Sequence, residues 1–259
     1  MESPLVCGNL RQLCRREPLR DEIEGVTAIS DAAVVERVGP IDRVSNAICR
    51  RAFSLPEALA YELTIAQTLA EVVVPAIKPY LVGSRVLDVG CGGGRIATGL
   101  AAALPVSVVG VDPSMPQIHR LTRHARHVPA VTGILARGES LPFAEGSFDS
   151  VISSCAWKHW PDPTLGVAEC LRVLRPGGSL VIVEIDGSST ADEFWRFARN
   201  SRVPLGMRRA YLRFAMRTVV GVAPGHGALE RSFHEAGVLR PGIRRIEGMP
   251  FWLVTAEAK

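Results

Sequence analysis

A glycine-dense turn between an apolar strand and a helix is the feature that most constrains this fold. Residues 86–95 read Val-Leu-Asp-Val-Gly-Cys-Gly-Gly-Gly-Arg, with glycines at 90, 92 and 94. Because glycine has no Cβ, the backbone of such a turn can take positive φ angles and lie directly against a ligand. The sequence therefore predicts a strand, turn and helix that contact a small ligand, with a tight structural turn as the alternative.

Asp88 separates this turn from the fingerprint of nicotinamide dinucleotides. That fingerprint reads Gly-x-Gly-x-x-Gly, and counting from Gly90 puts Arg95 where the third glycine belongs. A carboxylate at 88 would repel a pyrophosphate, whereas it suits a cofactor with a cationic amino-acid end and no phosphates. S-adenosylmethionine has that chemistry. An NAD(P)-dependent oxidoreductase is the alternative, which Arg95 and Asp88 disfavour.

A second acid follows at the spacing that a nucleoside cofactor requires. Residues 96–104 are predicted as a helix and 106–111 as a second strand, and Asp112 ends that strand 24 residues after Asp88. A carboxylate at the tip of the second strand is well placed to accept hydrogen bonds from ribose hydroxyls. The spacing favours a ligand site over a merely structural turn.

Strands and helices continue to alternate, which predicts an α/β, Rossmann-like, doubly wound sheet with its ligand site at the carboxyl ends of the strands. The predicted strands are 131–135, 148–153, 179–185, 243–247 and 251–256, and the predicted helices are 55–74, 163–174 and 227–236. Ser54 and Glu57 form a capping-box pair at the first of these helices, and Pro75 and Pro79 are expected to end it. The short link 248–250 predicts an antiparallel hairpin.

Length and composition indicate one globular α/β domain with extensions. The chain has 259 residues, 47% of them hydrophobic, and a net charge of +4, which permits an anionic partner without requiring one. We expect an N-terminal extension at 1–52, helical and acting as a cap, and the main domain at 53–259. Nothing indicates nucleic-acid binding, and the oligomeric state is not indicated.

The cysteines and histidines predict neither disulfides nor a metal site. The six cysteines include no Cys-x-x-Cys pair, so they are expected to be reduced thiols in a cytoplasmic protein. His119, His124 and His127 lie on a predicted outer helix, where no carboxylate or cysteine completes a metal shell.

Between about residues 84 and 186, and more loosely to 257, the chain resembles the class I S-adenosylmethionine-dependent methyltransferases, in particular the type 11 small-molecule branch that includes quinone-ring methyltransferases. The resemblance rests on Leu-Asp-Val-Gly-Cys-Gly-Gly-Gly at 87–94, Gly-Val-Asp-Pro-Ser at 110–114, Glu-Ser-Leu-Pro-Phe at 139–143, Gly-Ser-Phe-Asp at 146–149 and Leu-Arg-Val-Leu-Arg-Pro-Gly-Gly at 171–178. It implies a seven-stranded sheet whose last strand is antiparallel, and transfer of the sulfonium methyl group to a nucleophilic atom.

The resemblance also implies which residues hold S-adenosylmethionine and its product, S-adenosylhomocysteine. Asp88 is expected near the methionine end and Asp112 on the ribose. The full set is Asp88, Gly90, Cys91, Gly92, Gly94, Asp112, Pro113, Ser114, Gly138, Glu139, Ser154 and Cys155. One departure concerns the adenine: family members often carry Gly-Asp-Ala-Glu where this chain has Ala-Arg-Gly-Glu at 136–139. Arg137 cannot accept a hydrogen bond, so the backbone around Gly138 and Glu139 is expected to replace it.

The acceptor side is less well defined by the sequence. His159 is the candidate general base, and Trp157 and Trp160 are candidate walls for an apolar acceptor. Glu184 and Asp186 are candidates for orienting a hydroxyl, with a structural role as the alternative. The expected reaction is methyl transfer to an oxygen or carbon of a small apolar or lipid-like molecule. A catalytically silent cofactor-binding protein is the further alternative.

Residues 187–224 are expected to form a helical lid over the acceptor. Thr190 and Glu193 form a second capping-box pair, and seven arginines stand against two acids between 190 and 217. Aromatic residues interleave with them, so an amphipathic pair of helices is predicted. Two interpretations of the charge remain open: a solvated basic face, which such runs usually indicate, or contact with an anionic or lipid-linked acceptor or an acidic membrane surface.

Overall fold

The computed structural model of the chain describes residues 61–215, 219–220 and 223–259. The chain divides into two units, 1–30 and 31–259, and all the described residues belong to the second. The predicted N-terminal extension at 1–52 and the Ser54–Glu57 capping pair lie outside the described residues.

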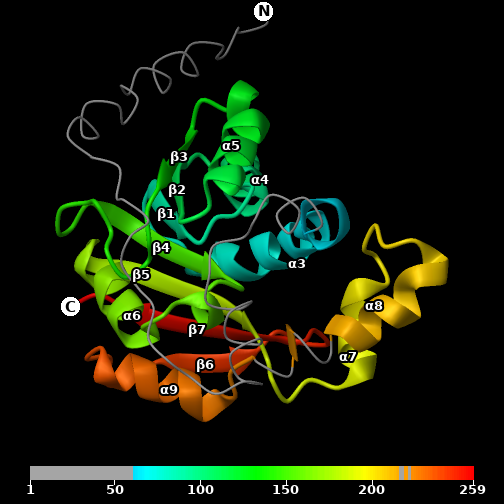
Figure 1. The fold of residues 1–259 in the computed structure, drawn as a ribbon. Helices are drawn as coiled ribbons and strands as arrows, with labels where there is room; N and C mark the ends of the chain where they lie inside the picture. The colour runs from blue at the N-terminus through cyan, green and yellow to red at the C-terminus, as the bar shows by residue number, and fades with distance from the viewer. Residues whose placement is uncertain (1–60, 216–218, 221–222) are drawn as a thin grey trace, which may run out of the picture. The chain divides into compact units, whose positions relative to one another are not determined.

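A seven-stranded sheet forms the centre of the described structure, with the strand order β3-β2-β1-β4-β5-β7-β6 (Figure 1). The strands are β1 Arg85–Val89, β2 Ser107–Asp112, β3 Val131–Leu135, β4 Phe148–Ser154, β5 Leu174–Ile185, β6 Gly242–Arg245 and β7 Phe251–Glu257. Neighbouring strands from β3 to β5 pair in parallel, whereas β7 pairs antiparallel with both β5 and β6. The predicted doubly wound sheet with an antiparallel last strand is confirmed.

Helices cover both faces of the sheet. They are α3 Gln67–Ile77, α4 Arg95–Ala103, α5 Met115–His124, α6 Pro163–Arg172 and α9 His226–Glu235. Figure 1 shows α3, α4 and α5 on one side of the sheet and α6 and α9 on the other. The central strands are covered on both faces, so β1 is buried along nearly its whole length, as expected for a strand in a parallel sheet.

The first described helix extends beyond the predicted end. Pro75 was expected to end it, but Pro75 lies inside α3, which continues to Ile77. Tertiary packing outweighs the hydrogen bond that proline removes. Val73 and Ile77 are fully buried, and Gly99 of α4 lets the two helices approach closely, because a Cβ there would lie 3.2 Å from Val74 Cγ2.

Strand β5 also begins earlier than predicted. The Arg-Pro-Gly-Gly stretch at 175–178, which precedes the predicted strand at 179–185, is part of β5. Leu174 pairs with Phe148 and Ser179 pairs with Ser150, so the ladder to β4 shifts its register between these two pairs. The two glycines are therefore accommodated in an irregular strand segment.

The predicted lid contains two described helices, α7 Ala191–Ala198 and α8 Arg208–Ala215, which follow the carboxyl end of β5 (Figure 1). The capping box is confirmed, since the Thr190 hydroxyl accepts from the Glu193 amide and the Glu193 carboxylate accepts from the Thr190 amide. None of the helices in the described ranges is long and apolar enough to cross a membrane.

Candidate functional site

A cavity of about 440 Å³ lies at the carboxyl ends of the parallel strands, where β1, β2, β4 and β5 all contribute residues. This is the edge at which a doubly wound sheet places its ligand site. One end is bordered by the turn after β1 and by acids, and the other is bordered by aliphatic and aromatic side chains. We call these the acidic end and the apolar end.

The glycine turn after β1 is built as the sequence predicted. Gly90, Gly92 and Gly94 all have positive φ, of 77°, 53° and 77°. A Cβ on Gly90 would lie 2.3 Å from Ala156 Cβ, and one on Gly94 would lie 2.7 Å from Leu121 Cγ, so both glycines are required by packing. At Gly92 the nearest atom would be 3.7 Å away, and Gly92 is the glycine whose open side faces the cavity.

Asp112 connects the second strand to this turn. Its Oδ2 accepts from the Gly92 amide at 3.0 Å, and its Oδ1 accepts from the Ser114 amide at 2.8 Å. Desolvation raises the pKa of Asp112 to about 6, although these two amides act in the opposite direction. Each carboxylate oxygen can accept a further bond, so Asp112 fixes the shape of the turn and still presents acceptors to the cavity.

Asp88 is almost fully buried, although it borders the cavity. Burial, followed by the nearby charge of Asp112, raises the pKa of Asp88 to about 7. A positively charged group at the acidic end would favour the ionised forms of both acids.

Three polar atoms of the cavity wall have no hydrogen-bond partner among the described residues: Asp88 Oδ2, Gln117 Oε1 and Ser154 Oγ. Buried polar atoms are normally satisfied, so such a cluster is typical of a ligand site. S-adenosylmethionine carries an ammonium group, ribose hydroxyls and an amino-substituted base, and the donor and acceptor set at the acidic end fits these groups.

Of the predicted cofactor residues, most border the cavity. They are Asp88, Gly90, Cys91, Gly92, Asp112, Pro113, Gly138, Glu139, Ser154 and Cys155. Gly94 and Ser114 are not in its lining: Gly94 begins α4 against Leu121, and Ser114 is the buried residue before α5. Their positions are explained by the turn and helix geometry that they support.

The segment after β4 separates the two ends of the cavity. Cys155 has a φ of 55°, and it is the one non-glycine residue in the described chain with a positive φ. Such a conformation is strained and is held by its surroundings. Lys158 Nζ donates to the Cys155 carbonyl at 2.8 Å and forms an ion pair with Glu184 Oε1 at 2.8 Å. Desolvation raises the pKa of the Cys155 thiol to about 12, so it remains protonated.

Aromatic and aliphatic side chains form the apolar end. The residues there include Ile65, Leu69, Ile185, Phe194, Phe197, Tyr211 and Phe251. Phe197 stacks edge-on against Phe251, with 4.9 Å between ring centroids. His159 and Trp160 also border the cavity, whereas Trp157 is buried outside its lining. The apolar end can therefore hold an apolar group.

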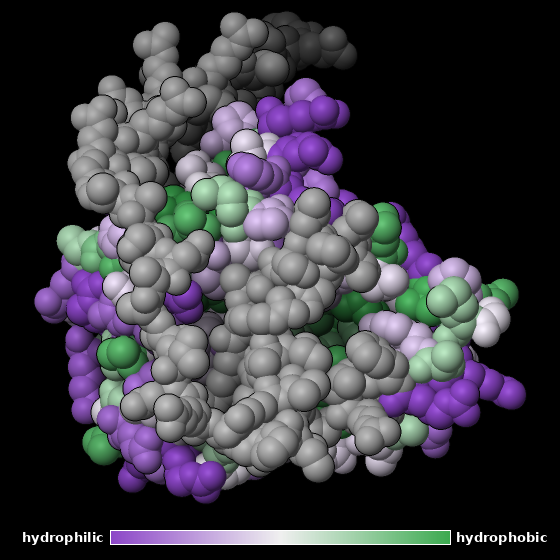
Figure 2. Space-filling model, in the orientation of Figure 1, coloured by the Kyte–Doolittle hydropathy of each residue, from purple (hydrophilic) through white to green (hydrophobic). Residues whose placement is uncertain are grey.

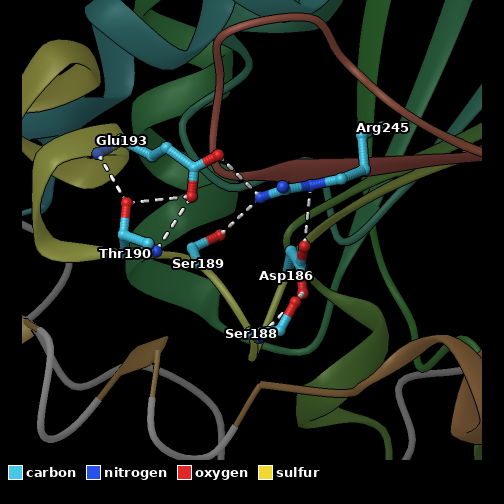
Figure 3. Close-up of polar contacts among 6 residues, drawn as sticks. All are labelled: Asp186, Ser188, Ser189, Thr190, Glu193 and Arg245. Carbon is cyan, nitrogen blue, oxygen red and sulfur yellow. Dashed lines mark hydrogen bonds and ion pairs between the residues drawn. The ribbon is translucent and has the colours of Figure 1, made fainter.

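Glu184 and Asp186 do not border the cavity, although both are fully buried. Glu184 binds Lys158, as described above. Asp186 accepts from Ser188 and pairs with Arg245 Nε at 2.9 Å, and Arg245 also reaches Glu193 at 3.1 Å (Figure 3). These acids therefore organise the walls of the site, and a direct role in orienting substrate is not what the geometry indicates.

Sequence reasoning missed three contributors: Gln117 in the wall, Lys158 as the partner of Glu184, and Arg245. Their signals are weak, because a glutamine in an amphipathic helix and a lysine after a strand usually face solvent. His124, at the end of α5, has a structural role that the sequence did not show, since its Nδ1 lies 2.6 Å from the Gly93 carbonyl. In the described residues no group of three His, Cys, Asp or Glu could hold a metal.

Comparisons with known proteins agree with this geometry. Residues 87–182 match the family model described as "Methyltransferase domain". An uncharacterized methyltransferase of Mycobacterium tuberculosis is 40% identical over 99 residues, which cover 38% of this chain and 39% of the relative. The ubiquinone/menaquinone biosynthesis C-methyltransferase of Geobacter sp. strain M21 is 39% identical over 105 residues, covering 39% of this chain and 45% of that protein.

The solved structure of an S-adenosylmethionine-dependent methyltransferase from Methanococcus maripaludis, whose title calls it putative, has the same fold. It superposes with a TM-score of 0.60 at 14% identity, and the match covers 88% of this chain and 98% of that one. Residues 87–182 thus match a methyltransferase domain, and the described chain has the fold of known S-adenosylmethionine-dependent methyltransferases. The chain spans less than half the length of the curated relatives that it matches.

Proposed function

We propose that the protein transfers the methyl group of S-adenosylmethionine to an oxygen or carbon atom of a small apolar or lipid-like molecule. The observation that carries the proposal is the single cavity that joins the acidic end to the apolar end. Such a cavity can hold a charged nucleoside and an apolar acceptor side by side. Holding two reactants in the right orientation supplies a large part of the rate enhancement of a transfer reaction.

The residues divide the work as follows. Bound S-adenosylmethionine supplies an electrophilic methyl group and is released as S-adenosylhomocysteine. Asp88 would neutralise its positively charged amino-acid end, and Asp112 would accept from the ribose hydroxyls. Gly138 and Glu139 would contact the adenine. His159 would take the proton of an acceptor hydroxyl or acidic carbon, and this step matters only when the acceptor is weakly acidic.

The acceptor class is supported by the wall of the apolar end and by the relatives. Seven aliphatic and aromatic side chains stand there, and Lys158, Arg95 and Arg137 are the basic residues of the lining. The Geobacter relative is named for C-methylation in ubiquinone and menaquinone biosynthesis. An acceptor with an apolar body and a polar, ionisable atom fits both observations. We also propose that the reaction takes place in the cytoplasm.

Two measurements test the proposal. Calorimetric titration should show micromolar binding of S-adenosylmethionine and S-adenosylhomocysteine and no binding of NAD; the reverse result would replace the proposal by a dehydrogenase. Incubation with methyl-labelled S-adenosylmethionine and lipid or quinone extracts should then give labelled organic product. Tight cofactor binding with no transfer into any extract would indicate a catalytically silent binding protein.

A further inference from the structure

Two strongly exposed hydrophobic side chains lie together at the outer end of the lid. Leu205 is 79% exposed and Met207 is 63% exposed, and both belong to the single turn Leu205–Met207 between α7 and α8. Gly206 stands between them, and a Cβ there would meet no atom within 4 Å. A single exposed hydrophobic residue needs no explanation, but two at one projecting turn form an apolar tip.

Exposed arginines precede and follow this turn in the sequence. They are Arg196, Arg199, Arg202, Arg209 and Arg213. No acidic residue occurs between 194 and 215 in the sequence, and the nearest acid, Glu193, is already paired with Arg245. Figure 2 shows hydrophobic and hydrophilic residues side by side at the end of the molecule that carries α8 in Figure 1. The tip therefore combines apolar side chains with an excess of positive charge, since residues 190–215 hold six arginines against the two acids Asp192 and Glu193.

Hydrogen bonds within the loop and to Thr64 hold the loop that carries the tip in place. Arg208 donates to the carbonyls of Val203 and Ser201, and the Arg202 amide donates to the carbonyl of Thr64. Ser201 and Val203 are buried. These contacts fix the turn with its hydrophobic residues facing outward, so the exposure of Leu205 and Met207 follows from the loop's own hydrogen bonds and packing.

The other side of the same lid forms part of the cavity wall. Phe194 and Phe197 of α7 and Tyr211 of α8 border the apolar end. One helical pair thus connects an apolar, basic outer tip to the apolar end of the cavity.

We propose that the α7–α8 turn docks on an anionic lipid bilayer, with Leu205 and Met207 entering the acyl region and the arginines against the headgroup phosphates. Basic residues near an anionic surface and inserted apolar side chains are the two contributions that together give stable peripheral binding. The docking stands independently of the reaction. That it serves to deliver a membrane-dissolved acceptor rests on the proposed function.

The test is co-sedimentation of the whole protein with vesicles of phosphatidylcholine, alone or with about one third phosphatidylglycerol. We expect binding to the anionic vesicles that falls as salt is raised, and little binding to the neutral ones. Equal binding to both kinds of vesicle, or binding to neither, would overturn the proposal.

Two pairs of variants test whether binding depends on the tip itself or on the hydrophobicity and charge of the protein surface in general. Leu205→Ser with Met207→Ser should lower anionic-vesicle binding at least about tenfold. The control is Leu239→Ser, which changes a residue that is 75% exposed after α9 and should have no effect. Arg202→Gln, Arg209→Gln and Arg213→Gln together should lower binding about 100-fold, whereas Arg126→Gln, Arg231→Gln and Arg240→Gln should lower it much less.

The same variants exclude the other occupant of such a tip, a second copy of this chain. If the tip joined two copies, the serine variant would lose a dimer in sedimentation velocity without vesicles, and this result would overturn the proposal. Calorimetry with S-adenosylhomocysteine should give wild-type affinity for every variant. Failure of the docking therefore stays distinct from failure of the proposed methyl transfer.

Discussion

At the scale of single residues, ionisation of the two acids at the acidic end of the cavity lowers the stability of the ligand-free fold. Asp88 is fully buried beside Asp112, and the pKa values of the two carboxyls are raised to about 7 and about 6. Near neutral pH the folded protein therefore resists ionising both acids. A cation bound between them would remove that resistance, so the same two residues couple ligand charge to the stability of the fold.

This coupling predicts how stability depends on pH. Because the fold favours the neutral forms, their stabilising effect is fully present below about pH 4, the pKa of an unfolded aspartate, and is lost as the pH rises through 6 and 7. For Asp88, a rise of about three pKa units corresponds to roughly 4 kcal/mol. Denaturant titrations of the ligand-free protein should show unfolding free energy falling by a few kcal/mol between about pH 4 and pH 7 and levelling off above.

Asp88→Asn should flatten that fall and weaken S-adenosylmethionine binding about tenfold or more, because a charge-assisted contact is lost. Glu247→Gln, at an exposed position in the β6–β7 connection, is the matched control and should change neither property. A pH profile of Asp88→Asn identical to that of the wild type would show that Asp88 is not the titrating group.

Gly92 and Gly248 allow a matched comparison of strain with ligand contact. Both have positive φ, 53° and 69°, and a Cβ at either position meets no atom closer than 3.7 Å. Alanine at each should therefore destabilise by a similar amount, about 1 kcal/mol. Only Gly92→Ala places its methyl in the cavity, and it should weaken S-adenosylhomocysteine binding at least tenfold in calorimetry. Similar affinities for the two variants would place the cofactor elsewhere.

His159 is the residue on which the chemistry can be tested directly. His159→Ala should lower the turnover number about 100-fold or more if the acceptor must lose its proton, and it should leave cofactor affinity nearly unchanged. Single-turnover methyl transfer measured across pH is the readout. Unaltered turnover would remove His159 from the mechanism and leave positioning alone as the source of catalysis.

At the scale of elements, one arginine connects the lid to the edge of the sheet. Arg245 of β6 reaches Asp186 after β5, Ser189 before the lid, and Glu193 in the first turn of α7 (Figure 3). Asp186 has no exposed surface, and Arg245 and Ser188 are its hydrogen-bonding and ion-pair partners. Since α7 carries Phe194 and Phe197, the network fixes two aromatic walls of the cavity.

Arg245→Gln should therefore affect the acceptor more than the cofactor. Removing the partner of a buried carboxylate is destabilising, but Arg245 is 39% exposed, so we expect only about 1 to 2 kcal/mol in denaturant titrations. The Michaelis constant for the acceptor should rise severalfold, with S-adenosylhomocysteine affinity unchanged. Arg240→Gln, exposed before β6, serves as the control. An unchanged Michaelis constant would show that the contacts of Arg245 do not position the aromatic residues of α7.

The elements were predictable to different degrees, for physical reasons. Short strands such as 131–135 and the capping box at Thr190 match because their signals are local. Pro75 inside α3 and the start of β5 at Leu174 were mispredicted because packing against α4 and pairing with β4 outweigh local preference. The Lys158–Glu184 pair joins residues 26 apart, and no local pattern marks it.

At the scale of the whole molecule, the doubly wound, mostly parallel sheet follows from the alternation of strands and helices, whereas the apolar end of the cavity does not. Its walls come from α3, from the end of β5, from the lid and from β7, which are distant in sequence. The acidic end is contributed by consecutive segments, and most of the residues predicted to lie there line the cavity. The identity of the acceptor depends on the shape that these walls form together, and no single sequence motif encodes that shape.

Cofactor binding should stabilise the molecule as a unit. At a ligand concentration about 100 times the dissociation constant, the gain is about 2.7 kcal/mol, which corresponds to a rise of roughly 5 to 10 °C in Tm for a domain of this size. Differential scanning fluorimetry with S-adenosylhomocysteine measures it. The absence of any rise at saturation would contradict a cofactor site formed only by the folded sheet.

The antiparallel direction of β7 has a practical consequence. Phe251, at the start of this strand, pairs with Ile185 beside the cavity, whereas Glu257 pairs with Ser179 at the opposite edge of the sheet. The Ala258 carbonyl accepts from Gly177 there. A label attached after Lys259, such as a fluorophore or an affinity handle, would therefore lie at the end of the sheet opposite the cavity. The site would stay open in binding assays on immobilised protein.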